Sequence, residues 1–176
     1  VHVSVITASY GFLALGCALG FLTLILFTCK SSHQIVATIK HLSAINEITL
    51  ILGLSLLVIG NFLGGVWANE SWGRYWGWDP KETWAYISIL VYTLILHVRL
   101  VPRIYSHYSF AVLSLLGFAS ILMTYFGVNF YLAGMHSYAT GDPVPIPTWV
   151  YVCGGVVAVL ILVSYKNRRL PKFSDA

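Results

Sequence analysis

Residues 72–101 read WGRYWGWDPKETWAYISILVYTLILHVRLV, and this stretch decides the fold. Its first thirteen residues hold four tryptophans among charged side chains. Asp79, Pro80 and Glu82 follow the order of a helix start, with an N-cap acid, a proline at the first helical position and a capping-box glutamate. The apolar run over residues 84–101 is close to the roughly 20 residues that a helix needs to cross a bilayer. The stretch therefore predicts an aromatic surface segment followed by a transmembrane helix.

The composition indicates a membrane protein. Of the 176 residues, 58% are hydrophobic and 9% are charged, whereas a soluble domain has about 25% charged residues. No segment alternates polar and apolar residues as the strands of a membrane barrel do. The sequence predicts an all-α, polytopic bundle of five transmembrane helices, over residues 3–29, 48–67, 84–101, 108–130 and 149–165.

The basic residues orient these five helices. Only Arg74 and Lys81, of the ten lysines and arginines, fall in the connection between the second and third spans. The others fall on the opposite side of the bundle: Lys30, Lys40, Arg99, Arg103, Lys166, Arg168, Arg169 and Lys172. Because short cytoplasmic loops are rich in lysine and arginine, we expect the N-terminus outside and the C-terminus in the cytoplasm. The net charge of +4 then reflects topology and does not indicate a nucleic-acid partner.

This topology puts three separate parts of the chain on the outer face. They are the start of the first helix with His2, a tryptophan-rich segment over residues 67–84, and a loop over residues 131–147 that carries His136. Residues 1–176 are expected to form one membrane domain. Because the sequence does not begin with Met, we expect this domain to be part of a longer chain.

His97 is the one histidine expected deep within a span. It follows Pro80 by 17 residues and therefore lies roughly 25 Å deeper, towards the inner leaflet. An ionisable side chain within a span predicts a functional role. The alternative is a neutral imidazole that bonds a neighbouring helix or reaches the inner interface. His33, His41 and His107 are expected in solvated cytoplasmic loops.

Two outer histidines beside a tryptophan cluster suit a planar metal macrocycle. Haem iron takes two axial ligands, commonly histidine, and its ring stacks on aromatic side chains. His2 and His136 are the expected ligands, and either Arg74 or Lys81 could pair with the haem carboxylates. The aromatic residues expected against the ring are Trp67, Trp72, Trp76, Trp78 and Trp84. The alternative is an aromatic belt at the membrane interface, with surface histidines beside it.

Two residue types that often carry chemistry have plainer roles here. Asp79 is expected to cap the third helix, with a catalytic carboxylate as the alternative. Cys17, Cys29 and Cys153 lie in or beside apolar runs, at spacings that match no zinc site and no disulfide framework. We interpret them as small apolar residues. The chain has no C-x-x-C-H motif, so it is not itself a c-type cytochrome.

Four stretches together resemble the haem-handling protein family with a WWD domain. They are WGRYWGWDPKETWA at residues 72–85, HVSVITASYGFLAL at residues 2–15, LHVRL at residues 96–100 and TYFGVNFYLAGMHSY at residues 124–138. Within that family they are most similar to the CcsA (ResC) type of System II cytochrome c synthase. The WDPKE stretch favours this type over the exporter branch of System I. The resemblance covers most of the chain and is to the carboxy-terminal core of the family, which implies that residues 1–176 are the carboxy-terminal part of a longer chain.

The resemblance implies a function and a set of site residues. Family members transport haem b across the membrane and attach it to the C-x-x-C-H cysteines of apocytochrome c, as a haem-lyase or synthase. By position, His2 and His136 match the outer iron ligands and His97 matches one membrane ligand, while Asp79 belongs to the WWD segment. The second membrane ligand of the family comes from a CcsB (ResB)-like portion, which this sequence lacks. No separate catalytic acid or base is implied.

Three other functions are compatible with the same residues. A haem exporter or chaperone would pass haem on without chemistry. A membrane electron-transfer subunit would hold haem between facing histidines within the bilayer, and only one deep histidine is expected here. A structural membrane subunit would use its tryptophans as an interface belt. The expected location is the bacterial inner membrane, with the thylakoid membrane as the alternative.

Overall fold

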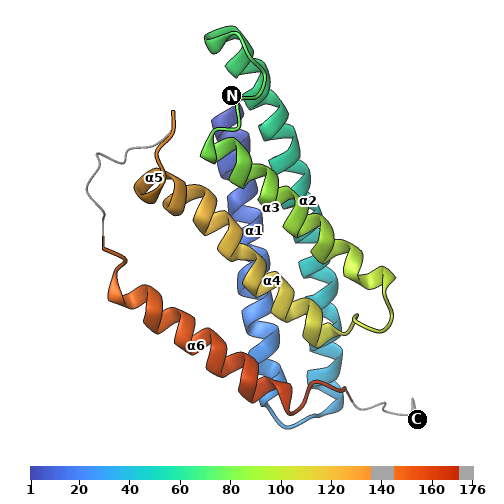
Figure 1. The fold of residues 1–176 in the computed structure, drawn as a ribbon. Helices are drawn as coiled ribbons and strands as arrows, with labels where there is room; N and C mark the ends of the chain where they lie inside the picture. The colour runs from blue at the N-terminus through green and yellow to red at the C-terminus, as the bar shows by residue number, and fades with distance from the viewer. Residues whose placement is uncertain (136–144, 171–176) are drawn as a thin grey trace.

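The computed structural model describes residues 1–135 and 145–170, whose regular structure is entirely helical (Figure 1). Five helical spans are long and apolar enough to cross a membrane: His2–Thr28, His33–Trp72, Pro80–Leu100, His107–Tyr131 and Thr148–Tyr165. Their main helices are α1 (His2–Thr28), α2 (His33–Trp72), α3 (Pro80–His97), α4 (His107–Leu122) and α6 (Thr148–Tyr165). Short segments extend two of them: η1 (Val98–Leu100) extends α3, and the π-helix η2 (Met123–Gly127) and α5 (Val128–Tyr131) extend α4. The predicted all-α membrane bundle is confirmed.

α2 is much longer than the span predicted over residues 48–67. It has 40 residues, which corresponds to about 60 Å. The connection before it is a short turn, because Ser32 caps the helix and its Oγ accepts a hydrogen bond from the Ile35 N–H at 3.3 Å. The polar residues that follow continue the helix. The prediction of a loop before the second span is therefore wrong, and His33 and His41 lie on α2.

Glycines let α1 and α2 pack closely. A Cβ atom added to Gly53 would lie 2.6 Å from Leu13 Cδ2, and one added to Gly60 would lie 2.6 Å from Ile6 Cγ1. Small residues that allow close approach of two backbones are a main source of helix association in a bilayer. The contact between Ile6 and Gly60 holds the first turns of α1, which begins at His2, against the last third of α2.

α3 and α4 complete the core of the bundle. The main buried cluster consists of Leu13, Leu50, Leu57, Tyr92, Ile95, Phe110 and Ile121. A buried hydrogen bond from Asn46 Nδ2 to Ser114 Oγ, at 3.1 Å, joins α2 to α4, and an ion pair between Arg99 and Glu47 joins the end of α3 to α2. His107 was expected to be solvated, but it is half-buried at the start of α4, where the helix packs on α1 and α2.

α6 contacts the other helices mainly through its carboxy-terminal half. The Tyr108 hydroxyl donates to the Ile161 carbonyl at 2.7 Å, and the Asn167 side chain donates to the Phe27 carbonyl at 3.0 Å. Its amino-terminal half leans away from α4 in Figure 1. Trp149 is 66% exposed there. An apolar surface of this kind suits lipid, because helices satisfy their own backbone hydrogen bonds.

Because successive helices run in opposite directions, three separate parts of the chain lie at one end of the bundle. The start of α1, the segment between α2 and α3, and the end of α5 all lie at this end (Figure 1). The described basic residues outside Arg74 and Lys81 lie towards the other end: Lys30, Lys40, Arg99, Arg103, Lys166, Arg168 and Arg169. Lys172 lies outside the described residues. The architecture therefore assembles one site from distant stretches of sequence.

Candidate functional site

A pocket of about 180 Å³ opens at the tryptophan end of the bundle. Its walls come from α1, α2, the α2–α3 segment, the start of α3 and the π-helix η2. Five of the predicted site residues line it: His2, Trp67, Trp72, Trp76 and Lys81. The structure thus brings together one expected iron ligand, three expected aromatic residues and one expected cation.

His2 stands at the first turn of α1, against the aromatic wall. Its ring centroid lies 5.4 Å from that of Trp67, with the planes tilted by 34°. Trp67 in turn meets Trp72 edge-on at 5.0 Å. A Cβ atom on Gly64 would lie 3.6 Å from His2 Cδ2, so the small residue leaves room for the imidazole beside α2. The imidazole and two indoles therefore form one continuous wall.

The segment after α2 turns back sharply towards the pocket. Gly73 ends α2 in the left-handed conformation, with φ 71°, which a residue without Cβ adopts at no steric cost. Trp76 lines the pocket and meets Trp78 edge-on at 5.8 Å. Trp78 has φ 58°, a conformation that is rare for a bulky residue. It is 72% exposed and does not line the pocket, whereas Trp67, Trp72 and Trp76 do.

The N-cap role predicted for Asp79 is confirmed. Its carboxylate accepts from the Lys81 N–H at 3.2 Å, and the Glu82 carboxylate accepts from the Asp79 N–H at 3.3 Å and the Gly77 N–H at 2.8 Å. Asp79 Oδ1 also accepts from the Met135 N–H at 2.7 Å. The two acids therefore hold backbone groups, and Asp79 ties the segment after α5 to the start of α3.

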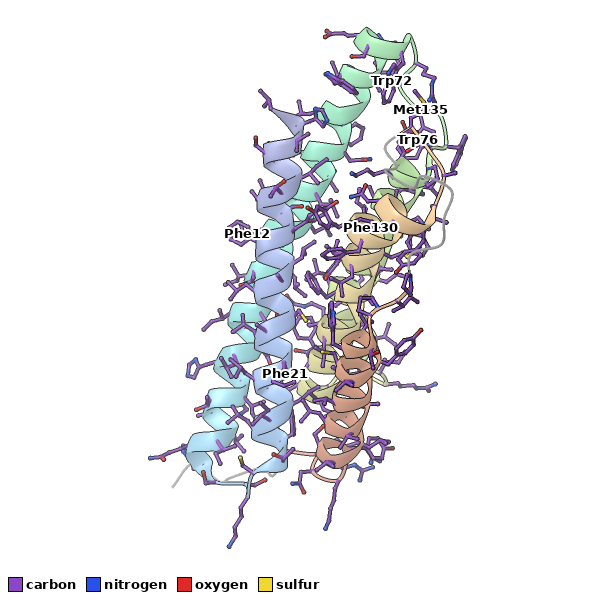
Figure 2. All side chains as sticks on the ribbon, turned by 90° about the vertical axis from the view of Figure 1, so that its left-hand side faces the viewer. Phe12, Phe21, Trp72, Trp76, Phe130 and Met135 are labelled. Carbon is purple, nitrogen blue, oxygen red and sulfur yellow. The ribbon has the colours of Figure 1, made fainter. Side chains whose placement is uncertain are left out.

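The second expected iron ligand, His136, lies outside the described residues, as does most of the expected loop over residues 131–147. The residue before it is well defined by contacts. Met135 bonds Asp79, and its sulfur accepts from Arg74 Nη2 at 2.8 Å. The Arg74 guanidinium also lies 5.8 Å from the centroid of the Trp72 ring. Figure 2 shows Met135, Trp72 and Trp76 at the same end of the molecule.

The π-helix η2 contributes residues that the sequence interpretation missed. Thr124 and Tyr125 line the pocket, and Tyr125 meets Tyr10 of α1 edge-on at 6.4 Å. Thr124 Oγ1 lies 3.0 Å from Ser88 Oγ and 3.1 Å from the Trp84 carbonyl oxygen. A π-turn inside a longer helix often marks a functional site. Trp84 contacts η2 in this way and does not itself line the pocket.

His97 lies far from the pocket, at the last residue of α3. It is exposed on the surface of the bundle, and its Nδ1 lies 2.7 Å from the Thr93 carbonyl oxygen. Because a carbonyl only accepts, Nδ1 carries the proton in this bond. In the neutral imidazole, which is the form that binds metals, Nε2 then has the free lone pair.

The donor set of the pocket fits haem better than a free metal ion. Among the described residues, no group of three or more His, Cys, Asp and Glu side chains could hold a metal ion. Haem brings four equatorial nitrogens of its own and needs only axial ligands from protein. An imidazole, flat indole walls and one ammonium group are chemically matched to its iron, its ring and its carboxylates.

Comparison with known proteins identifies a family and several relatives. The profile of the family described as Cytochrome C assembly protein matches residues 1–136. The chain is 63% identical over 172 residues to Protein NrfI of Wolinella succinogenes, covering 97% of the chain and 19% of NrfI. It is 41% identical over 140 residues to the cytochrome c biogenesis protein CcsA of Chlamydomonas reinhardtii, covering 78% of the chain and 39% of that protein.

A further relative has a similar match. The chain is 37% identical over 162 residues to CcsA of Guillardia theta, covering 78% of the chain and 52% of the relative. The chain therefore spans about a fifth to a half of the length of these proteins. A family profile over more than three quarters of the chain, together with relatives of this identity, is sufficient to assign it. This integral membrane protein belongs to the cytochrome c assembly protein family and is of the CcsA type.

Proposed function

We propose that the protein holds haem b at the described pocket for covalent attachment to apocytochrome c, after the haem has crossed the membrane. The observation that carries the proposal is the pocket itself, in which His2 and three indoles from two other parts of the chain share one cavity. Membership of the cytochrome c assembly family supports the wider role in cytochrome c maturation.

At the outer position, His2 and His136 would bind the iron from opposite faces. The support for His2 is its place at the pocket beside Trp67. The support for His136 is its position in the sequence, directly after Met135. Asp79 and Arg74 hold Met135 at the same end of the bundle. The two imidazoles would also set the redox poise of the iron.

At the deeper position, His97 would bind haem through Nε2. The Thr93 carbonyl favours that tautomer, and the exposure of His97 on the side of the bundle leaves it accessible to a ligand from a neighbouring segment. A CcsB-like portion, fused or separate, is the proposed source of the second imidazole. Haem would then move outward along the bundle by about the length of α3.

The proposed orientation puts the tryptophan end outside. Basic residues gather towards the other end of the bundle, as they do in the cytoplasmic loops of membrane proteins. The bacterial inner membrane is the proposed location, with the thylakoid membrane as the alternative. Apocytochrome c would approach the pocket from the outer side.

The proposed chemistry adds each cysteine S–H across one haem vinyl group. The sulfur bonds one vinyl carbon and the hydrogen ends on the other, so no electrons are gained or lost overall. In this scheme the residues of the pocket bind and orient the ring. Positioning alone can lower such a barrier by several kcal/mol. Asp79 and Glu82 hold backbone N–H groups, so neither is assigned a proton-transfer role.

The decisive experiment is co-expression with a protein that carries C-x-x-C-H, using the chain within its full-length protein. Covalent haem is measured on a denaturing gel for the wild type, His2→Ala and His136→Ala. We expect both variants to lose attachment and added imidazole to restore part of it. Haem release without covalent product in the wild type would favour an exporter, and a Soret band without either activity would favour an electron-transfer subunit.

A further inference from the structure

Lys81 is the only lysine or arginine that lines the described pocket. It lies in the first turn of α3 and is half-buried. Its Nζ donates to the side-chain oxygen of Asn129, at 3.3 Å, and Asn129 is itself buried on α5. This neutral amide orients the ammonium group in the pocket, and the carboxylate that acts on its charge from nearby is that of Asp79.

The nearby acids hold backbone groups. Asp79 accepts from two backbone N–H groups, and so does Glu82. In residues 1–135 and 145–170 the only ion pair joins Arg99 to Glu47, near the other end of α3. Asp79 attracts Lys81 but forms no close ion pair with it among these residues. A half-buried cation without a close ion pair is costly, so this wall of the pocket favours an anionic ligand group.

Arg74, the other cation considered from sequence, has different contacts. Its guanidinium donates to the Met135 sulfur and lies over the Trp72 ring, and it does not line the pocket. A Cβ atom on Gly77 would overlap its Nη1, so the guanidinium packs against the backbone of the segment. Arg74 therefore connects Trp72 and Met135 outside the pocket, whereas Lys81 lines the pocket.

We propose that Lys81 pairs with a carboxylate of the haem and thereby sets the orientation of the ring in the pocket. This inference rests on the proposed haem-binding function and adds the group that recognises the carboxylate. The two carboxylates of protoporphyrin lie on one edge and the two vinyl groups on the other half of the ring. Pairing at Lys81 therefore turns the vinyl groups away from the start of α3. A lipid phosphate has similar chemistry, so the test must separate the two sources.

The test compares haem with its dimethyl ester, which has the same ring and iron but no carboxylate charge. Each is titrated, with detection by Soret absorbance, into the protein in nanodiscs of neutral lipid and in nanodiscs that contain phosphatidylglycerol. The variants are Lys81→Met, which removes the charge, and Lys81→Arg, which keeps it. Lys30→Met is the matched control, because it removes the same charge at the far end of α1, about 40 Å away.

We expect the wild type, Lys81→Arg and Lys30→Met to bind haem about 10- to 100-fold more tightly than the ester, as expected for a charge-assisted hydrogen bond. Lys81→Met should lose this preference through weaker binding of haem, with unchanged affinity for the ester. Equal loss of both ligands in Lys81→Met, with its thermal unfolding unchanged, would overturn the inference. So would a preference that disappears only with anionic lipid, since lipid phosphate would then occupy Lys81. If the wild type binds neither compound, the proposed haem function fails, whereas equal binding of both by the wild type rejects only the role of Lys81.

Discussion

Asp79 Oδ1 lies 2.7 Å from the backbone nitrogen of Met135. The acid that starts α3 therefore also fixes the residue that precedes His136. Gly134 packs directly on this contact, since a Cβ atom there would lie 2.7 Å from Asp79 Oδ1 and 2.8 Å from Pro80 Cδ. Asp79, within the tryptophan-rich segment, thus connects that segment to the segment after α5.

Replacing Asp79 should separate the two segments. Asp79→Ala loses the cap and the bond to Met135, and we expect a loss of stability of about 1–3 kcal/mol. Asp79→Asn keeps an oxygen that accepts these bonds and should lose less. Thermal unfolding in detergent measures stability, and Soret absorbance measures haem binding, which we expect to fall in the order wild type, Asn variant, Ala variant.

The matched control for the cap alone is Ser32→Ala. Ser32 caps α2 at the opposite end of the bundle, so its loss should cost about 1 kcal/mol and leave haem binding unchanged. Haem binding that falls equally in the Asp79 and Ser32 variants would show that general stability, and not the Met135 contact, is responsible.

Gly134→Ala tests the same contact from the other side. The added methyl group has no room beside Asp79 and Pro80, so the segment must shift and haem affinity should fall at least several-fold. Gly154→Ala is the control, because a Cβ atom there meets nothing within 4 Å. Isothermal titration with ferric haem measures both. Equal affinities in the two variants would contradict a role for this close approach.

Thr124→Val should disturb the π-helix beside the pocket. The substitution keeps the shape but removes the hydroxyl contacts with Ser88 and the Trp84 carbonyl, at a cost of about 1–2 kcal/mol. We expect a shifted Soret maximum because Thr124 and its neighbour line the pocket. Thr49→Val is the control, since the Thr49 hydroxyl bonds only a carbonyl of its own helix. An identical spectrum in both would argue against a functional role for η2.

His97→Ala should lower the haem that co-purifies with the protein. Its Nε2 is the proposed deep ligand, and His97 does not line the described pocket, so titrated haem should still bind at that pocket. His41→Ala, an exposed histidine on α2, is the control. Pyridine haemochrome absorbance gives the haem content of each preparation. Unchanged content in His97→Ala would remove this residue from the path of haem.

The sequence predicts the helices better than it predicts their lengths. Five apolar runs mark five spans because a bilayer demands continuous apolar helix. The same criterion fails for α2, whose polar residues after Ser32 continue the helix, because hydropathy detects hydrocarbon depth and not helix ends. A capping serine is the signal that could have located the start of α2.

The site is only partly predictable for a similar reason. Composition identifies the tryptophan segment, and the alternation of spans places His2 beside it. Backbone details then decide which side chains face the pocket. The positive φ of Trp78 turns this residue outward, and the π-turn of η2 brings in Tyr125. Neither deviation from regular backbone has a periodic pattern in the sequence.

The most direct test of the central claim is electron paramagnetic resonance of the ferric haem complex, recorded for the wild type, His2→Ala and His136→Ala. If His2 and His136 both bind one haem iron, the wild type gives a low-spin signal with two imidazole ligands. Each single variant then becomes high-spin, and added imidazole restores the low-spin signal. A low-spin signal that is unchanged in both variants would contradict the account, because the iron would then be held by other residues.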